Sequence, residues 1–177
     1  MAGFERAGGY RNMRHIISIL MQNEAGALTR VANLFSSRGY NIESLNVAPT
    51  ADDTVSRLTL VTTGADPIIE QITKQLGKLI DVVEIVDMTS ADHIERELAL
   101  FKLEVADGGR DKLAAVVEQF DARVLNETNE HYTVEVVGGS QEIDRFLKRI
   151  AGVSDVITLV RSGAMAVTRG EPTLKSA

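Results

Sequence analysis

The spacing of apolar residues changes repeatedly along the first half of the chain. Residues 16–21 are almost continuously apolar, which is typical of a strand covered on both faces. Apolar residues then recur at helical spacing at Leu28, Val31, Ala32 and Phe35. Gly39 follows where a left-handed residue commonly ends a helix. Residues 41–50 alternate irregularly as far as Pro49, a residue that a sheet accepts at its edge. These patterns predict a strand, a helix and an edge strand.

A second strand, helix and strand follow directly. Residues 57–62 alternate between polar and apolar side chains, as a strand with one buried face does. Isoleucines and leucines then form one stripe at Ile68, Ile69, Ile72, Leu76 and Leu79. Residues 82–86, "VVEIV", have the composition of a last strand. The predicted order is βαββαβ.

This order occurs twice in the sequence. The segment that starts at Leu58 aligns without a gap on the segment that starts at Tyr132. Matching positions include Gly64 with Gly138, Ile69 with Ile143, Lys74 with Lys148, Asp81 with Asp155 and Val86 with Val160. With a shift upstream, the apolar positions of the first helix align with Leu113, Val116 and Phe120. We therefore predict an α+β protein of two tandem ferredoxin-like βαββαβ domains.

Breaks in the apolar pattern give the domain boundaries. We expect residues 1–12 to be a flexible N-terminal extension and residues 13–89 to form the first domain. Polar residues at 90–96 break the apolar pattern and predict a linker. The second domain should cover residues 97–162, and residues 163–177 should be a loosely held tail.

Composition excludes several classes of protein. The 177 residues contain no cysteine, so disulfides, thiolate metal sites and a cysteine nucleophile are absent. A formal charge of −6 disfavours binding to nucleic acid, which needs clustered cations. The apolar run at residues 16–21 is far shorter than the ~20 residues that span a bilayer, and the first twelve residues lack a signal-peptide core. We expect a cytoplasmic protein that binds neither nucleic acid nor membrane.

Catalytic or metal-binding patterns are weak. The histidines, His15, His93 and His131, are too dispersed for a metal-ligand spacing, and we interpret them as solvated. The acidic run "DHIERE" at 92–97 beside the domain boundary also suggests solvated carboxylates. "DGGRDK" at 107–112 has glycines before a helix, as an anion cradle does, but a plain turn explains it better. The glycine-flanked Arg161 and Arg169 either clamp a carboxylate or solvate the tail. We predict no catalytic residue and no metal ligand.

The turn "NEAGAL", 23–28, joins the first strand to the first helix, where backbone N–H donors face outward. Gly26 lets a ligand approach the backbone, and Asn23 offers both an amide donor and a carbonyl acceptor. These groups suit the carboxylate and ammonium of a free amino acid. Asn41 and Ile42 would complete the polar contacts and supply an apolar wall for a short aliphatic side chain. An Asx-type turn explains the same residues equally well. In the second copy, Gly108 aligns with Asn23 and Asp111 with Gly26, so a ligand carboxylate would be repelled there.

Several stretches resemble one known family, the small regulatory subunits of acetolactate synthase (acetohydroxyacid synthase), whose N-terminal half is an ACT domain. They are "NEAGALTRVANLFSSRGYNIESLNVAPT", "EQITKQLGKLIDV", "ERELALFKLEV" and "RSGAMAVTRG". The resemblance covers the chain from Met13 onward. It implies a non-catalytic chain in branched-chain amino acid biosynthesis that activates a separate catalytic (large) subunit and confers feedback inhibition by valine. Thiamine diphosphate, Mg and FAD would belong to that partner, and this chain would hold no cofactor.

The same resemblance implies a homodimer that pairs through the ACT edge strand and shares its effector sites. Valine would contact Asn23, Gly26, Ala27 and Leu28 of one chain, and Asn41 and Ile42 of the other. The alternatives are an ACT-domain regulator of a different biosynthetic enzyme and a stand-alone ferredoxin-like enzyme of the acylphosphatase type. The latter needs an arginine in the loop that here reads "NEAG". RNA-binding domains share the element order, but the strands lack their stacking aromatics.

Overall fold

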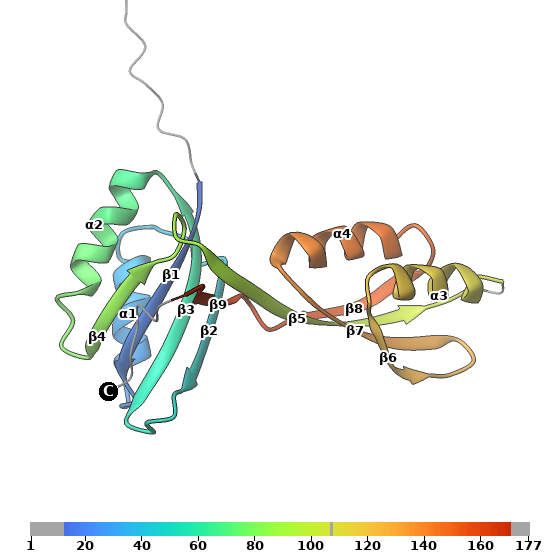
Figure 1. The fold of residues 1–177 in the computed structure, drawn as a ribbon, viewed down its shortest axis with the longest axis horizontal. Coiled ribbons are helices and arrows are strands. Elements are labelled where there is room, and N and C mark those ends of the chain that lie inside the picture. Colours follow the sequence, from blue (N-terminus) through green and yellow to red (C-terminus); the bar gives the residue numbers. More distant parts are fainter. Residues whose placement is uncertain (1–12, 107, 171–177) are drawn as a thin grey trace, which may run out of the picture. The chain divides into compact units, whose positions relative to one another are not determined.

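The computed structural model describes residues 13–106 and 108–170, which form two compact units. Residues 13–93 with 168–170 make the first unit, and residues 94–167 make the second. Each unit consists of one sheet with two helices packed on one face (Figure 1). The predicted pair of ferredoxin-like α+β domains is confirmed. The predicted extension at residues 1–12 lies outside the described residues.

The first unit has the predicted order of elements. They are β1 (Met13–Gln22), α1 (Ala27–Ser36), β2 (Ser44–Pro49), β3 (Val55–Gly64), α2 (Asp66–Leu76) and β4 (Val82–Asp87). The strands lie in the order β2-β3-β1-β4, so β2 is at an edge of the sheet, as its proline suggested. The adjacent strands are antiparallel.

One face of this sheet and both helices form the core. Ile17 and Ile19 of β1 lie opposite Leu60 and Leu58 of β3 in the register, and all four are fully buried. The helices contribute Ala27, Val31 and Phe35 from α1, and Ile69, Ile72 and Leu76 from α2. A fully buried aliphatic side chain contributes about 1.5–3 kcal/mol, so this layer dominates the stability of the unit.

The second unit repeats the architecture. It contains β5 (His93–Glu104), α3 (Arg110–Gln119), β6 (Arg123–Glu127), β7 (His131–Gly138), α4 (Ser140–Ile150), β8 (Asp155–Arg161) and β9 (Met165–Thr168). The sheet order is β6-β7-β5-β8, and β9 also pairs with β5. In the core, Phe146 of α4 makes edge contacts with Phe101 and Phe120, with ring centroids 4.8 and 5.4 Å away.

Two predicted boundaries are wrong. The linker expected at 90–96 is too long, because β5 already begins at His93. The tail expected from residue 163 contains β9, which is paired with β5 and is therefore not loosely held. Both segments mix polar and apolar residues, so their periodicity does not mark them as strands. They become strands because β5 and β9, which are remote in sequence, pair with each other.

Candidate effector site

The predicted effector turn lies between β1 and α1. Gly26 is the N-cap of α1 and has a φ of +89°, a left-handed conformation that favours glycine. The backbone N–H of Asn23 donates to the carbonyl of Thr54 at 2.7 Å, and its Nδ2 donates to the carbonyl of Asp53 at 2.8 Å. The turn is therefore held against the loop that joins β2 to β3. The structure gives Asn23 a positioning role that the sequence did not indicate.

The next two residues point in opposite directions. Ala27 is 1% exposed and belongs to the core, whereas Leu28 is 37% exposed. Leu28 recurs at helical spacing in the sequence but lies outside the buried stripe of α1, which Ala27, Val31 and Phe35 form. Leu28 instead offers an apolar surface beside the turn, where a ligand side chain can reach it.

Asn41 and Ile42 lie beyond the other end of α1. This helix has ten residues, and at 1.5 Å per residue it separates the two groups by about 15 Å. The carbonyl of Asn41 accepts a hydrogen bond of 2.7 Å from Thr62 Oγ1, while the Asn41 side chain is exposed. Within one chain, therefore, the structure does not bring the six predicted residues together. A second copy would have to supply Asn41 and Ile42.

An ion pair that was not predicted from the sequence lies next to this turn. Arg30 Nη2 donates to Asp81 Oδ1 at 2.7 Å, and its Nε donates to the other carboxylate oxygen. These hydrogen bonds hold the pKa of Asp81 below its usual range. A Cβ added at Gly26 would lie 3.0 Å from Arg30 Nη1. The guanidinium therefore lies against the effector turn, and its other edge is bound to Asp81.

One of the three histidines, His15, is buried between two aspartates. His15 is 3% exposed, with Asp66 Oδ1 3.4 Å from its Nε2 and Asp87 Oδ2 3.7 Å from its Nδ1. The interpretation of His15 as solvated is wrong, because its side chain is buried on the face of β1 that also carries Ile17 and Ile19. Within residues 13–106 and 108–170, no three His, Asp or Glu side chains are close enough to hold a metal ion.

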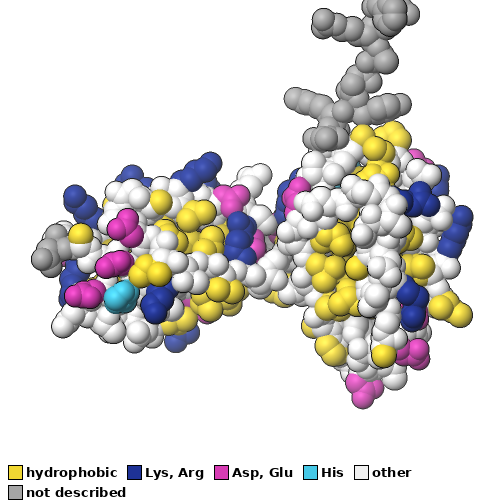
Figure 2. All heavy atoms as spheres, turned by 180° about the vertical axis from the view of Figure 1, so that it is seen from behind, with side chains coloured by type: hydrophobic (Ala, Val, Ile, Leu, Met, Phe, Trp, Pro, Cys, Tyr) yellow, Lys and Arg dark blue, Asp and Glu magenta, His cyan; other side chains and the backbone are white. Residues whose placement is uncertain are grey.

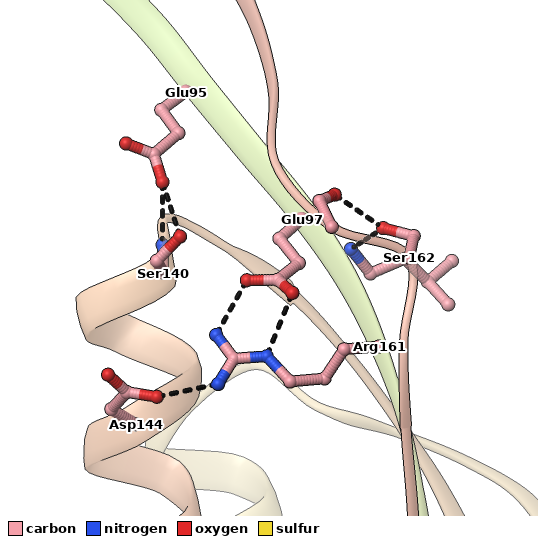
Figure 3. Close-up of polar contacts among 8 residues, drawn as sticks. Glu95, Glu97, Ser140, Asp144, Arg161 and Ser162 are labelled. Carbon is pink, nitrogen blue, oxygen red and sulfur yellow. Dashed lines mark hydrogen bonds and ion pairs between the residues drawn. The ribbon is translucent and has the colours of Figure 1, made fainter. Parts of the chain in front are cut away.

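The acidic run at 92–97 is not simply solvated either (Figure 3). Glu97 is 3% exposed, and both of its carboxylate oxygens accept hydrogen bonds from Arg161, at 2.8 and 2.7 Å. Arg161 Nη1 also donates to Asp144 at 2.8 Å. Glu95 accepts hydrogen bonds from the N–H and Oγ of Ser140, the first residue of α4. Arg161 thus clamps a carboxylate of its own chain, and both glutamates have structural roles.

The glycines of "DGGRDK" form a plain turn into α3. Gly108 has a φ of +80°, and Gly109 is the N-cap of α3. Arg110 points to the β6–β7 hairpin, where its Nη2 donates to the carbonyl of Asn129 at 2.9 Å. Asp107 lies outside the described residues. The arrangement supports a structural turn in preference to an anion cradle.

The fold of the first unit defines the class of protein: it is an ACT domain, and a model described as the AHAS small subunit-like ACT domain matches residues 17–84. A second model, described as the small subunit of acetolactate synthase, matches residues 96–170. The chain is 44% identical over 163 residues to the acetolactate synthase isozyme 3 small subunit of Escherichia coli K12, which covers 92% of this chain and all of that protein. It is 40% identical to the acetolactate synthase small subunit of Mycobacterium leprae over 88% of this chain and 92% of that protein.

A solved structure agrees. The acetolactate synthase small subunit from Thermotoga maritima superposes with a TM-score of 0.81 and 30% identity, covering 90% of this chain and 99% of that chain. The chain belongs to the family of acetolactate synthase small subunits, as the sequence stretches predicted. It is therefore a regulatory, non-catalytic chain. No helix in its described part is both long and apolar enough to cross a bilayer.

Proposed function

We propose that this chain binds the catalytic large subunit of acetolactate synthase, activates it, and makes it sensitive to feedback inhibition by valine. The observation that supports this most is the turn at Gly26. It combines a left-handed glycine, outward-facing helix N–H groups and the exposed Leu28 in a chain of this family. In this proposal, thiamine diphosphate, Mg and FAD bind to the large subunit and not to this chain.

The effector site is proposed to lie between two copies of the chain. β2 is the end strand in the sheet order β2-β3-β1-β4, and Val47 on it is 38% exposed. Such an edge invites pairing with its own copy. Asn41 and Ile42 of one copy would then complete the site at Asn23 and Gly26 of the other.

Valine would regulate by binding one arrangement of the dimer better than another, because only differential affinity shifts an equilibrium. The second unit is not proposed to bind valine. Its position equivalent to Gly26 is Asp111, in the first turn of α3, where a carboxylate would repel that of the ligand.

Reconstitution tests the proposal. The purified chain is added to the large subunit from the same genome, and acetolactate formation is measured with and without valine, isoleucine and leucine. We expect activation by the chain and inhibition by valine. Calorimetric titration of the chain alone should give heat with valine and none with lysine or glutamate. No activation, or activation without any amino-acid response, would contradict the proposal.

A further inference from the structure

Residues 79–83, the end of the turn after α2 and the first two residues of β4, expose apolar side chains beside the predicted effector turn; they are called the 79–83 turn below. Ile80 is 92% exposed and Val83 is 54% exposed. Exposed hydrophobic residues occur on the surfaces of both units (Figure 2), and singly they need no explanation. This turn differs because its exposed isoleucine lies next to Asp81, the buried partner of Arg30.

Backbone hydrogen bonds hold the turn in place. The N–H of Leu79 donates to Leu76 at 3.0 Å, and the N–H of Val82 donates to Leu79 at 3.1 Å. The carbonyl of Asp81 accepts a bond of 2.8 Å from Gln22, the last residue of β1. Leu79 and Val82 also pack against the core. The exposure of Ile80 is therefore fixed by its anchored neighbours.

The same aspartate connects this turn to Gly26. Its carboxylate binds Nε and Nη2 of Arg30, and Nη1 of Arg30 lies against the glycine. A carboxylate ligand at Gly26 would lie next to this guanidinium and compete with Asp81 for it. Occupancy of the effector turn would thereby change the forces on residues 79–83.

The second unit lacks this arrangement, although the two domains align. The counterpart of Asp81 is Asp155, which is exposed, and the counterpart of Arg30 is Ala115. Ser154 stands in place of Ile80. Shared ancestry of the two folds therefore does not account for the ion pair and the exposed isoleucine. Among the described residues, this ion pair and an exposed isoleucine at the position of Ile80 occur only in the unit that carries the proposed effector site, whereas Ile157, the counterpart of Val83, is 47% exposed in the second unit.

We infer that residues 79–83 contact the catalytic large subunit through Ile80 and Val83, and that the Arg30–Asp81 pair transmits effector binding to this contact. The inference rests on the proposed function. A regulator needs a surface that its partner contacts and whose state depends on the effector site. Here one ion pair joins the proposed contact surface to the predicted effector turn. An apolar side chain that fills a pocket of the partner is a usual source of binding energy at an interface.

Charge substitutions at this turn test the contact. In Ile80→Asp and Val83→Asp, the concentration for half-maximal activation of the large subunit should rise about tenfold or more, as for an interface anchor. The matched control is Val137→Asp, because Val137 has the same 54% exposure as Val83 but lies in the second unit. It should activate as the wild type does. Calorimetric valine binding and sedimentation of all three should match the wild type.

A second pair of variants tests the transmission. Asp81→Asn should still bind valine and activate, but the valine concentration that gives half inhibition should rise several-fold. Asp155→Asn should leave it unchanged. The contact would be overturned if Ile80→Asp activated as the wild type does, or if Val137→Asp lost activation equally. It would also be overturned if Ile80→Asp alone had an altered oligomeric state. If the wild-type chain itself did not activate, the proposed function would fail and the inference with it.

Discussion

Replacing Gly26 with aspartate separates ligand binding from folding. The added carboxylate would occupy the place where the ligand carboxylate is expected, next to the first N–H groups of α1. It would also lie within reach of Arg30, since a Cβ at this position is 3.0 Å from Nη1. That neighbour is the end of a long side chain whose other edge is bound to Asp81, so the guanidinium must shift by a few tenths of an ångström to admit the new residue. We expect the variant to activate the large subunit and to lose valine inhibition.

The stability cost can be worked out from the backbone. With a φ of +89°, a residue other than glycine costs about 1–2 kcal/mol in this left-handed region. Gly108 provides the matched control, because its φ is +80° and nothing lies within 4 Å of an added Cβ. Gly108→Asp should therefore lose a similar free energy of unfolding without touching the valine response. Gly26→Ala adds the strain at the effector turn without the charge.

The assay is valine inhibition of the reconstituted enzyme, with chemical denaturation of each variant alongside. Allosteric coupling of about 1–3 kcal/mol corresponds to roughly 5–150-fold in affinity, so its loss is easily measured. Valine inhibition of Gly26→Asp at the wild-type concentration would refute the reasoning. So would an equal loss of inhibition in Gly108→Asp, because the effect would then come from destabilisation.

Three further predictions concern the ion pairs and the edge strand. Glu97→Gln should lower the free energy of unfolding, measured by denaturation, by about 1–3 kcal/mol, because it weakens a buried charged hydrogen-bond pair. Asp144→Asn changes a side chain that is 54% exposed and should cost under about 1 kcal/mol. Equal losses in the two variants would contradict this. Val47→Pro should turn a dimer into a monomer by sedimentation, and a monomeric wild type at micromolar concentration would remove the basis of the shared site. Arg30 lowers the pKa of Asp81 below its ordinary 3.8. The ion pair therefore stabilises the folded chain fully above that pH, and this stabilisation is lost as the pH falls further. The stability difference between wild type and Asp81→Asn should thus be constant from about pH 7 to 5 and shrink below about pH 3.8, and a difference that grows on acidification would exclude the pair.

The fold was predictable because its signals are local or repeated. Helical and strand periods marked most elements, and the gapless alignment from Leu58 onto Tyr132 revealed the second copy. The structure confirms its core, since Ile69 and Ile143 are both buried. The upstream alignment was weaker, because Leu28 is exposed whereas Leu113 is buried.

Contacts between residues remote in sequence were not predictable. Arg30 and Asp81 are 51 positions apart, and neither stands in a pattern that indicates a partner. Glu97 and Arg161 are 64 positions apart. Glu97 looked like a solvated charge, and Arg161 was left open between clamping a carboxylate and solvating the tail. The residues of the predicted effector turn stood out in the sequence because glycine and asparagine have special backbone and hydrogen-bonding properties, and their binding of an effector stays a prediction. Their assembly with Asn41 into one site stays a prediction.

The pairing of β9 with β5 has a consequence for synthesis of the chain. β5 begins at His93, but its partner β9 ends at Thr168, so this pairing waits until residues 165–168 have left the ribosome. All strands and helices of the first unit precede β5 and can fold earlier. A chain truncated before Met165, by a premature stop codon or by proteolysis, would leave part of β5 as an open strand edge, and open edges promote aggregation. Residues 165–168 therefore protect the newly made chain against aggregation through β5.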